Sequence, residues 1–141
     1  MKKTIAEQLN VKDFPFYIKD KEGRVIYYEK SSGFWWRQEH DSEGNELYYE
    51  DSDGYWIKYE YDSEGNEIYR EDSDGYWNKK EHDLSGREIY FENSGGLWCK
   101  CEYDSVGNRI YYENSSGLIR DNRGKDDVIA LNGIKYKRID E

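Results

Sequence analysis

The chain has 141 residues, a length typical of one domain, and its formal net charge is −10. Hydrophobic residues make up only 35% of the chain, but aromatic residues reach 17%. The negative charge argues against direct binding to nucleic acid or to an anionic membrane, and the evenly spaced aromatic residues argue against an intrinsically disordered chain.

The first 22 residues differ from those that follow and predict an N-terminal cap. Residues 4–7 read Thr-Ile-Ala-Glu, a capping box that predicts a short helix through Leu9. Residues 13–18 then predict a first strand, in which Pro15 suits the edge of a sheet.

Residues 23–120 predict an array of β-hairpins. Two series of glycines recur every 21 residues: Gly23, Gly44, Gly65, Gly86 and Gly107, and Gly33, Gly54, Gly75, Gly96 and Gly117. A fixed period of this size is typical of repeat proteins. Aromatic and β-branched segments such as 55–61 and 67–71 lie between the glycines and predict strands. About five hairpins result, and we expect them to pair in order as an antiparallel meander.

The turns contain the residues that tight hairpin turns need. Residues 51–54 and 62–65 both place Asp first and Gly fourth, which predicts a type I turn followed by a glycine with positive φ. The acid spacing of an EF-hand loop is absent, so these segments are predicted to be turns rather than calcium sites.

Alternation along the strands divides the side chains between two faces. One face repeats the order Trp, cation, acid, acid, as in Trp56, Lys58, Glu60 and Asp62. The predicted structural ladder is Trp35, Trp56, Trp77 and Trp98 with Tyr48, Tyr69, Tyr90 and Tyr111, and the predicted acidic rows are Glu50, Glu71 and Glu92, and Asp62, Asp83 and Asp104. We expect the Trp residues to bury one another as the core of the sheet, with equivalent residues about 10 Å apart. Pairs of Lys or Arg with Glu across the strands are expected to offset the repulsion among the acids.

The other face changes from copy to copy and is the candidate binding surface. Its predicted residues are Phe34, Trp36, Tyr55, Ile57, Tyr59, Tyr76, Asn78 and Lys80. An odd period would exchange the two faces in successive copies if the turns had equal parity and the strands were regular. Three arrangements are open: turns of different parity, a bulge that restores the phase, or a sheet whose faces alternate.

Residues 121–141 predict a C-terminal hairpin cap. Residues 128–136 read VIALNGIKY, and the Asn-Gly pair favours a two-residue hairpin turn. The predicted fold is therefore all-β and forms one domain: an antiparallel meander of about five hairpins at residues 23–120, with a helix and strand at residues 1–22 and a hairpin at residues 121–141.

Few residues suggest chemistry. His40 and His82 occupy a position held by Tyr61 in another copy, which favours a stacked ring over a metal ligand. Cys99 and Cys101 lie two residues apart on a predicted strand and are expected to be free thiols. Nearly every acid recurs from copy to copy, so we expect no enzyme, no metal site and no cofactor.

The unit Tyr61-Asp62-x-x-Gly65-Asn66, followed by Asp72-x-x-Gly75, resembles the YD repeat of the RHS type over about residues 20–120. In the large RHS proteins such hairpins coil into a shell around a toxin domain, so the resemblance implies a β-hairpin scaffold without catalytic residues. A Trp ladder is foreign to that family's usual consensus. With about five copies, the chain looks more like the small stand-alone repeat proteins of phage and prophage genomes. The MORN-type sheet and choline-binding repeats are physical analogues.

The leading hypothesis is a non-enzymatic scaffold of phage or prophage origin that binds a protein partner, with a basic partner as one option. Two alternatives are open: an acidic mimic of nucleic acid that inhibits a host defence enzyme, and carbohydrate binding on the Trp ladder if those rings are exposed. Open sheet edges also allow a homodimer. No apolar leader follows Met1 and no run of 18 apolar residues predicts a membrane span, so a cytoplasmic location is expected.

Overall fold

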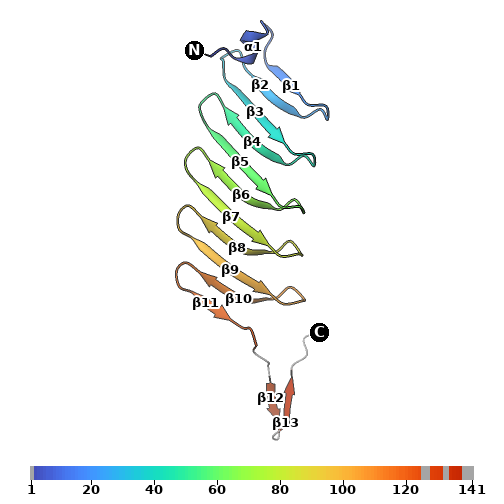
Figure 1. Cartoon of the computed structure of the whole chain (residues 1–141), viewed down its shortest axis with the longest axis vertical. Helices are drawn as coiled ribbons and strands as arrows, with labels where there is room; N and C mark the ends of the chain where they lie inside the picture. Colours follow the sequence, from blue (N-terminus) through green and yellow to red (C-terminus); the bar gives the residue numbers. More distant parts are fainter. Residues whose placement is uncertain (1, 125–127, 132–133, 138–141) are drawn as a thin grey trace.

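Each glycine-bounded segment of the sequence forms one strand of a long antiparallel sheet. A computed structural model describes residues 2–124, 128–131 and 134–137. Within these residues, eleven strands pair in the order of the sequence, so the sheet is a meander of hairpins (Figure 1). They are β1 (Phe16–Lys19), β2 (Val25–Glu29), β3 (Trp35–His40), β4 (Glu46–Asp51), β5 (Trp56–Tyr61), β6 (Glu67–Asp72), β7 (Trp77–His82), β8 (Glu88–Asn93), β9 (Trp98–Tyr103), β10 (Arg109–Asn114) and β11 (Ile119–Asp121). The predicted meander is confirmed.

The two turns of each repeat have the same form. Gly65 has a φ of +85°, and its amide donates a hydrogen bond to the Asp62 carbonyl oxygen at 3.1 Å. In the opposite turn, Gly54 has a φ of +91° and donates in the same way to Asp51 at 3.1 Å. Glycine adopts this left-handed conformation without the steric cost that a Cβ atom brings. The predicted turns are confirmed, and they share one parity.

A β-bulge in every repeat restores the phase of the sheet. Between β5 and β6, Tyr61 lies opposite Glu67 and Glu60 lies opposite Tyr69, which leaves Ile68 as an extra residue. The same shift occurs between β3 and β4, between β7 and β8, and between β9 and β10. One extra residue in an odd period returns each side chain to the same face in every copy. Of the three arrangements left open by the sequence, the structure has the bulge.

The cross-strand pairs define the two faces. Trp56 lies opposite Glu50, and Lys58 lies opposite both Tyr48 and Glu71. The side that carries these residues and their equivalents 21 residues away is called the repeating face. The side that carries the other set of alternate residues, such as Ile57 and its neighbours, is called the variable face.

Successive hairpins are staggered along the strand direction. Glu50 lies opposite Trp56 on one side and opposite Arg37 on the other, so Trp56 is level with Arg37 rather than with Trp35. Trp77 is level with Lys58 in the same way. Two strand spacings and a two-residue offset place equivalent Trp residues about 12 Å apart. The expected spacing of about 10 Å was too short because it ignored the offset.

The sheet is a single layer with little buried apolar surface. Among the described residues, the buried hydrophobic side chains are Ala6, Tyr27 and Ile57. The four ladder Trp residues are half-buried, and within the described part of the chain no ring contact joins one of them to another. The expectation that they bury one another is therefore wrong. The stagger places Glu50 opposite Trp56 and Arg37 level with it, where mutual stacking would have needed another ring.

The serine in the second position of the turn at residues 72–75, and its equivalents in three other copies, join consecutive hairpins. The Ser73 amide donates to the Trp56 carbonyl oxygen at 2.9 Å, and its hydroxyl oxygen accepts from the Trp56 amide at 3.2 Å. The equivalent bridges connect Ser52 with Trp35, Ser94 with Trp77, and Ser115 with Trp98. Each Trp backbone is therefore hydrogen-bonded beyond the end of the regular strand pairing.

Replacing Ser73 with alanine is expected to lower the free energy of unfolding by about 1 kcal/mol, because the Trp56 amide loses its acceptor. Chemical denaturation measures the change. Ser63→Ala is the matched control: Ser63 is exposed in the opposite turn, and its effect should stay within about 0.5 kcal/mol. Equal effects of the two substitutions would show that the bridge does not stabilise the array.

The N-terminal cap packs on the repeating face at the β1 end of the sheet. Helix α1 (Ile5–Gln8) has the predicted capping box, in which the Glu7 amide donates to the Thr4 hydroxyl oxygen at 3.2 Å. The Ala6 amide donates to the Glu29 carboxylate at 3.1 Å and so attaches the helix to the sheet. Strand β1 begins at Phe16, three residues later than predicted.

At the other end, β12 (Val128–Leu131) and β13 (Ile134–Lys137) pair as a separate two-stranded sheet. The predicted C-terminal hairpin is confirmed, although the Asn-Gly pair at residues 132–133 lies outside the described residues. The proposed boundaries at residues 22 and 120 remain predictions.

Candidate functional site

A file of five aromatic rings crosses the variable face from β1 to the start of β5. Neighbouring ring centroids lie 5.2, 5.8, 6.2 and 6.2 Å apart in the order Tyr17, Tyr28, Trp36, Tyr49 and Tyr55, which we call the aromatic file. Tyr17 is 49% exposed and the other four rings are half-buried. Aromatic stacking, expected on the repeating face, is therefore concentrated on the variable face.

Two of the predicted binding residues, Trp36 and Tyr55, belong to the aromatic file. Two others continue the surface beside it: Ile57 lies opposite Tyr49 and is only 5% exposed, and Tyr59 lies opposite Arg70. The Arg70 guanidinium carbon is 5.9 Å from the centre of the Tyr59 ring, within range of a cation–π interaction.

The remaining predicted residues extend this surface unevenly. Asn78 is nearly buried, and its amide nitrogen lies 3.5 Å from the Tyr76 hydroxyl. The Lys80 ammonium is 3.9 Å from the Glu67 carboxylate. Phe34 precedes β3, and the Lys30 ammonium lies 5.4 Å from its ring centre. The C-terminal half of the variable face is therefore more polar than the aromatic half.

Sequence reasoning missed three of the five rings in the aromatic file: Tyr17, Tyr28 and Tyr49. A signal was present, because Tyr28 and Tyr49 directly follow the recurrent Tyr27 and Tyr48 and must point to the opposite side.

Unpaired polar atoms are also confined to the variable face. Among the described residues, the buried side-chain polar atoms without a hydrogen-bond partner are His40 Nδ1, Arg70 Nε, Asn78 Oδ1 and His82 Nδ1. Leaving such an atom unpaired destabilises the folded protein. The hydrogen bonding of buried polar atoms is thus less complete on the variable face than on the repeating face.

The Glu row of the repeating face is engaged by neighbouring side chains. Glu50 accepts hydrogen bonds from Arg37 and from the Tyr48 hydroxyl, and Glu71 lies 3.0 Å from the Lys58 ammonium. Arg37 lowers the pKa of Glu50, and Lys58 likewise lowers that of Glu71. The expected pairs across the strands are confirmed in these two copies.

In the later copies the lysines contact tryptophan rings instead of forming ion pairs with the Glu row. The Lys79 ammonium lies 5.4 Å from the Trp77 ring centre, and that of Lys100 lies 5.5 Å from Trp98. Glu92 accepts from the Tyr90 hydroxyl at 3.1 Å. Within the described residues, neither lysine forms an ion pair.

The predicted Asp row belongs to the turns. Asp62 Oδ1 accepts from the amides of Glu64 and Asn66 at 3.0 and 2.9 Å, and Oδ2 accepts from the Asn66 side chain at 3.0 Å. Asp83 and Asp104 make the same backbone contacts. These hydrogen bonds lower the pKa of all three carboxyl groups. The aspartates are therefore already occupied in closing turns.

Acidification is expected to destabilise the array. The pKa values of Asp62, Asp83 and Asp104 are lower in the folded chain than the ordinary value, so their contribution is complete above about pH 5 and is lost as the pH falls through about 4 and below. Unfolding measured between pH 2 and 6 tests this dependence. Replacing all three with asparagine should flatten the slope of stability against pH, and an unchanged slope would contradict the assignment.

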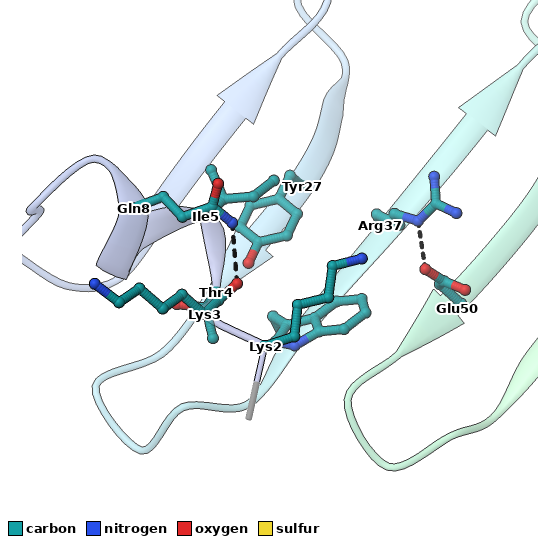
Figure 2. Close-up of a pocket in the computed structure, with 9 residues that line it drawn as sticks. Lys2, Lys3, Thr4, Ile5, Gln8, Tyr27, Arg37 and Glu50 are labelled. Carbon is teal, nitrogen blue, oxygen red and sulfur yellow. Dashed lines mark hydrogen bonds and ion pairs between the residues drawn. The ribbon is translucent and has the colours of Figure 1, made fainter.

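A pocket of about 310 Å³ lies at the N-terminal end of the repeating face (Figure 2). It is formed by the segment around Thr4 on one side and by strands β2 to β4 on the other. Its lining residues are Lys2, Lys3, Thr4, Ile5, Gln8, Tyr27, Trp35, Arg37 and Glu50. The sequence did not predict it, because it joins the non-repeated N-terminal segment to the first copy of the ladder.

The two cysteines and the two histidines do not form a metal centre with the other described residues. Cys99 and Cys101 are free and half-buried on the variable face, and burial raises the pKa of Cys99. His40 and His82 lie opposite Glu46 and Glu88. In the described part of the chain, no three His, Cys, Asp or Glu side chains converge as metal ligands do.

No helix among the described residues is long and apolar enough to cross a membrane.

Fold and surface together define a single-layer β-hairpin repeat with one repeating and one variable face. Solved structures of similar fold belong to Tc toxins. One is the Photorhabdus luminescens Tc holotoxin pore with a TccC3-D651A mutation, at 17% identity and a TM-score of 0.52, covering 82% of this chain and 6% of that chain. Another is the TcdB2-TccC3-Cdc42 crystal structure, at 17% identity and a TM-score of 0.53, covering 81% and 6%.

The likeness concerns fold, and this chain spans only a small part of the toxin chains it matches. Those chains contain YD-repeat β-structure of the RHS type, which agrees with the resemblance seen in the sequence. No family model matches the chain, and no curated protein matches it.

Proposed function

We propose that this chain is a non-catalytic β-repeat scaffold that binds a protein partner through its variable face. The observation that carries the proposal is the contrast between the faces: one repeats the same side chains in each copy, and the other presents a different set. Identical side chains in every copy serve the array itself. A face that changes between copies is free to match a partner.

The aromatic file supplies the anchors for such an interface. Tyr and Trp are enriched among the residues that dominate binding energy at protein interfaces. The file lies on an outer surface of a single-layer sheet, and Ile57 and Tyr59 continue it toward β6. Arg70 and Lys80 add positive charge beside it, so an acidic or neutral partner surface suits this face as well as a basic one.

The alternative functions have weaker support. Sugar binding usually needs an open ring face, but the stacked rings of the aromatic file cover one another, and lysines lie over Trp56, Trp77 and Trp98. A mimic of nucleic acid needs free, closely spaced acids, but Glu50 and Glu71 are paired with cations.

Affinity capture with paired variants tests the proposal. Tyr17→Ser with Tyr76→Ser alters two exposed side chains of the variable face, and Lys79→Gln with Glu81→Gln alters two exposed side chains of the repeating face. Each protein is immobilised and then incubated with a bacterial lysate at low and at high salt. The proteins that it retains are quantified by mass spectrometry. Both variants should fold, which circular dichroism checks.

The expected result is a partner retained by the wild type and the repeating-face variant but reduced at least tenfold with the variable-face variant. Loss of the partner only with the repeating-face variant, or equal loss with both, would overturn the proposal. Salt-sensitive capture of a basic nucleic-acid-binding protein through the repeating face would instead favour the acidic mimic.

A further inference from the structure

The N-terminal pocket is the place where the symmetry of the array is broken. The later copies of the repeating face carry the same order of Trp, cation and acid. The segment around Thr4 and Ile5 lies beside the Trp of the first copy, Trp35. The pocket volume of about 310 Å³ lies at the lower end of the range for small-molecule sites.

The floor of the pocket is aromatic. The rings of Tyr27 and Trp35 are stacked, with centroids 6.1 Å apart and planes 21° apart. Tyr27 is only 5% exposed and donates its hydroxyl hydrogen to Glu29 at 2.8 Å, which fixes the orientation of its ring. Trp35 is half-buried and lines the pocket together with Tyr27.

Trp35 differs from the other ladder Trp residues in having no cation from its own strand over its ring. In the later copies, a lysine two residues along the strand lies 5.4 to 5.6 Å from the ring centre. The corresponding residue here is Arg37, which reaches Tyr48 and Glu50 instead. A planar ligand can therefore stack on Trp35 without displacing a lysine.

Basic side chains line the pocket although the protein as a whole is acidic. They are Lys2, Lys3 and Arg37, and the one acid in the lining, Glu50, is bonded to Arg37 and to the Tyr48 hydroxyl. Arg37 donates from Nε to Glu50 and from Nη1 to Glu39 at 3.2 Å, so its Nη2 group is left without a partner among the described residues. Figure 2 shows the Lys2 side chain extending toward the side on which Arg37 lies, while Lys3 extends the other way. Within the described residues neither Lys2 nor Lys3 forms an ion pair, so the Lys2 ammonium, which lies toward Arg37, can contact an anion there.

We infer that this pocket binds a nucleoside monophosphate, with the base stacked on Trp35 and the phosphate between Lys2 and Arg37. Stacking of a base on an aromatic side chain is favourable for any base, and a phosphate dianion suits two adjacent cations. A longer nucleic acid would extend over the acidic repeats and be repelled. The ligand is therefore a single nucleotide.

Isothermal titration calorimetry with the full chain at low salt tests the inference. AMP should bind saturably with a stoichiometry of one. Adenosine has the base without the phosphate, and inorganic phosphate lacks the base, so each should bind at least tenfold more weakly than AMP. Lys2→Gln should weaken AMP binding about tenfold without changing the unfolding midpoint, since Lys2 is exposed. Lys79→Gln is the matched control: Lys79 is the equivalent of Arg37 two copies later and lies outside the N-terminal pocket, so the change should leave AMP binding unchanged.

Several outcomes would overturn the inference. They are an absence of saturable heat at millimolar AMP, inorganic phosphate binding as tightly as AMP, and an equal loss of affinity from Lys79→Gln and Lys2→Gln. A single-stranded oligonucleotide that binds more tightly than AMP would show that the site takes a nucleic-acid strand instead. The partner-capture experiment on the variable face is independent of all of these results.

Discussion

Deletion of residues 62–82 is expected to leave a cooperatively folded protein that is about 1–3 kcal/mol less stable than the full chain. The deletion removes one complete period, from one turn Asp to the residue before the next. Strand β5 would then pair with β8, placing Lys58 opposite Glu92 and Glu60 opposite Tyr90. These are the residue types that already face each other between β7 and β8. Circular dichroism and guanidinium unfolding measure the outcome.

Deletion of residues 62–81, one residue fewer, is the matched control and is expected to abolish cooperative unfolding. The turn at residues 83–86 would be intact, but β5 would be shifted by one residue against β8. Tyr59 would then lie opposite Glu92, and Glu60 would lie opposite Phe91, so the two faces would be exchanged halfway along the sheet. A shorter deletion as stable as the complete one would show that the faces do not specify the register.

Glu29→Ala is expected to lower the free energy of unfolding by about 2–3 kcal/mol. Glu29 is only 2% exposed, and its carboxylate accepts from the Ala6 amide at 3.1 Å and from the Tyr27 hydroxyl at 2.8 Å. Alanine would leave two buried donors without an acceptor and would release α1 from the sheet. Chemical denaturation measures the loss, and hydrogen exchange at the Ala6 amide reports on the helix contact.

Glu113→Ala provides the comparison, because Glu113 is the equivalent residue four periods later. It also accepts from a tyrosine hydroxyl, that of Tyr111 at 2.7 Å, but it is half-buried and has no helix to hold. Its replacement should cost less than about 1 kcal/mol. Tyr27→Phe removes one of the two donors to Glu29 and should fall between the two alanine variants. Equal losses at positions 29 and 113 would contradict the role of Glu29 in anchoring the helix.

The fold was largely predictable because its signals are local and repeated. Gly54 and Gly65 each mark a turn that needs positive φ, and the segments between such glycines are rich in aromatic and β-branched residues. The capping box at Thr4 also acts within one turn of helix. The start of β1 was misplaced because a single unrepeated segment offers no second copy for comparison.

Contacts between strands were less predictable because they depend on register. The bulge at Ile68 and the two-residue stagger decide which side chains meet, and neither changes the pattern of residues along a strand. The sequence therefore indicated that Trp56 and Trp77 share a face but not that they are too far apart to stack. Ser73 was overlooked for the same reason, since its partner Trp56 is 17 residues away.

The candidate site was predictable only in part. Trp36, Tyr55, Ile57 and Tyr59 were identified because their positions vary between copies, and the structure places them on one surface. Tyr49, in the centre of the aromatic file, was not identified. The N-terminal pocket depends on how an unrepeated segment packs against the first copy, which no periodic pattern encodes.

The stagger of the hairpins also determines what a longer chain of this kind would become. A two-residue offset for every two strands inclines the direction of growth by about 35° from the perpendicular to the strands, within the range of strand tilts found in closed β-barrels. Each added hairpin would advance and turn by the same step, so the sheet would wind as a spiral ramp. Copy number then sets whether the molecule is a short open ribbon or a wall around an enclosed volume.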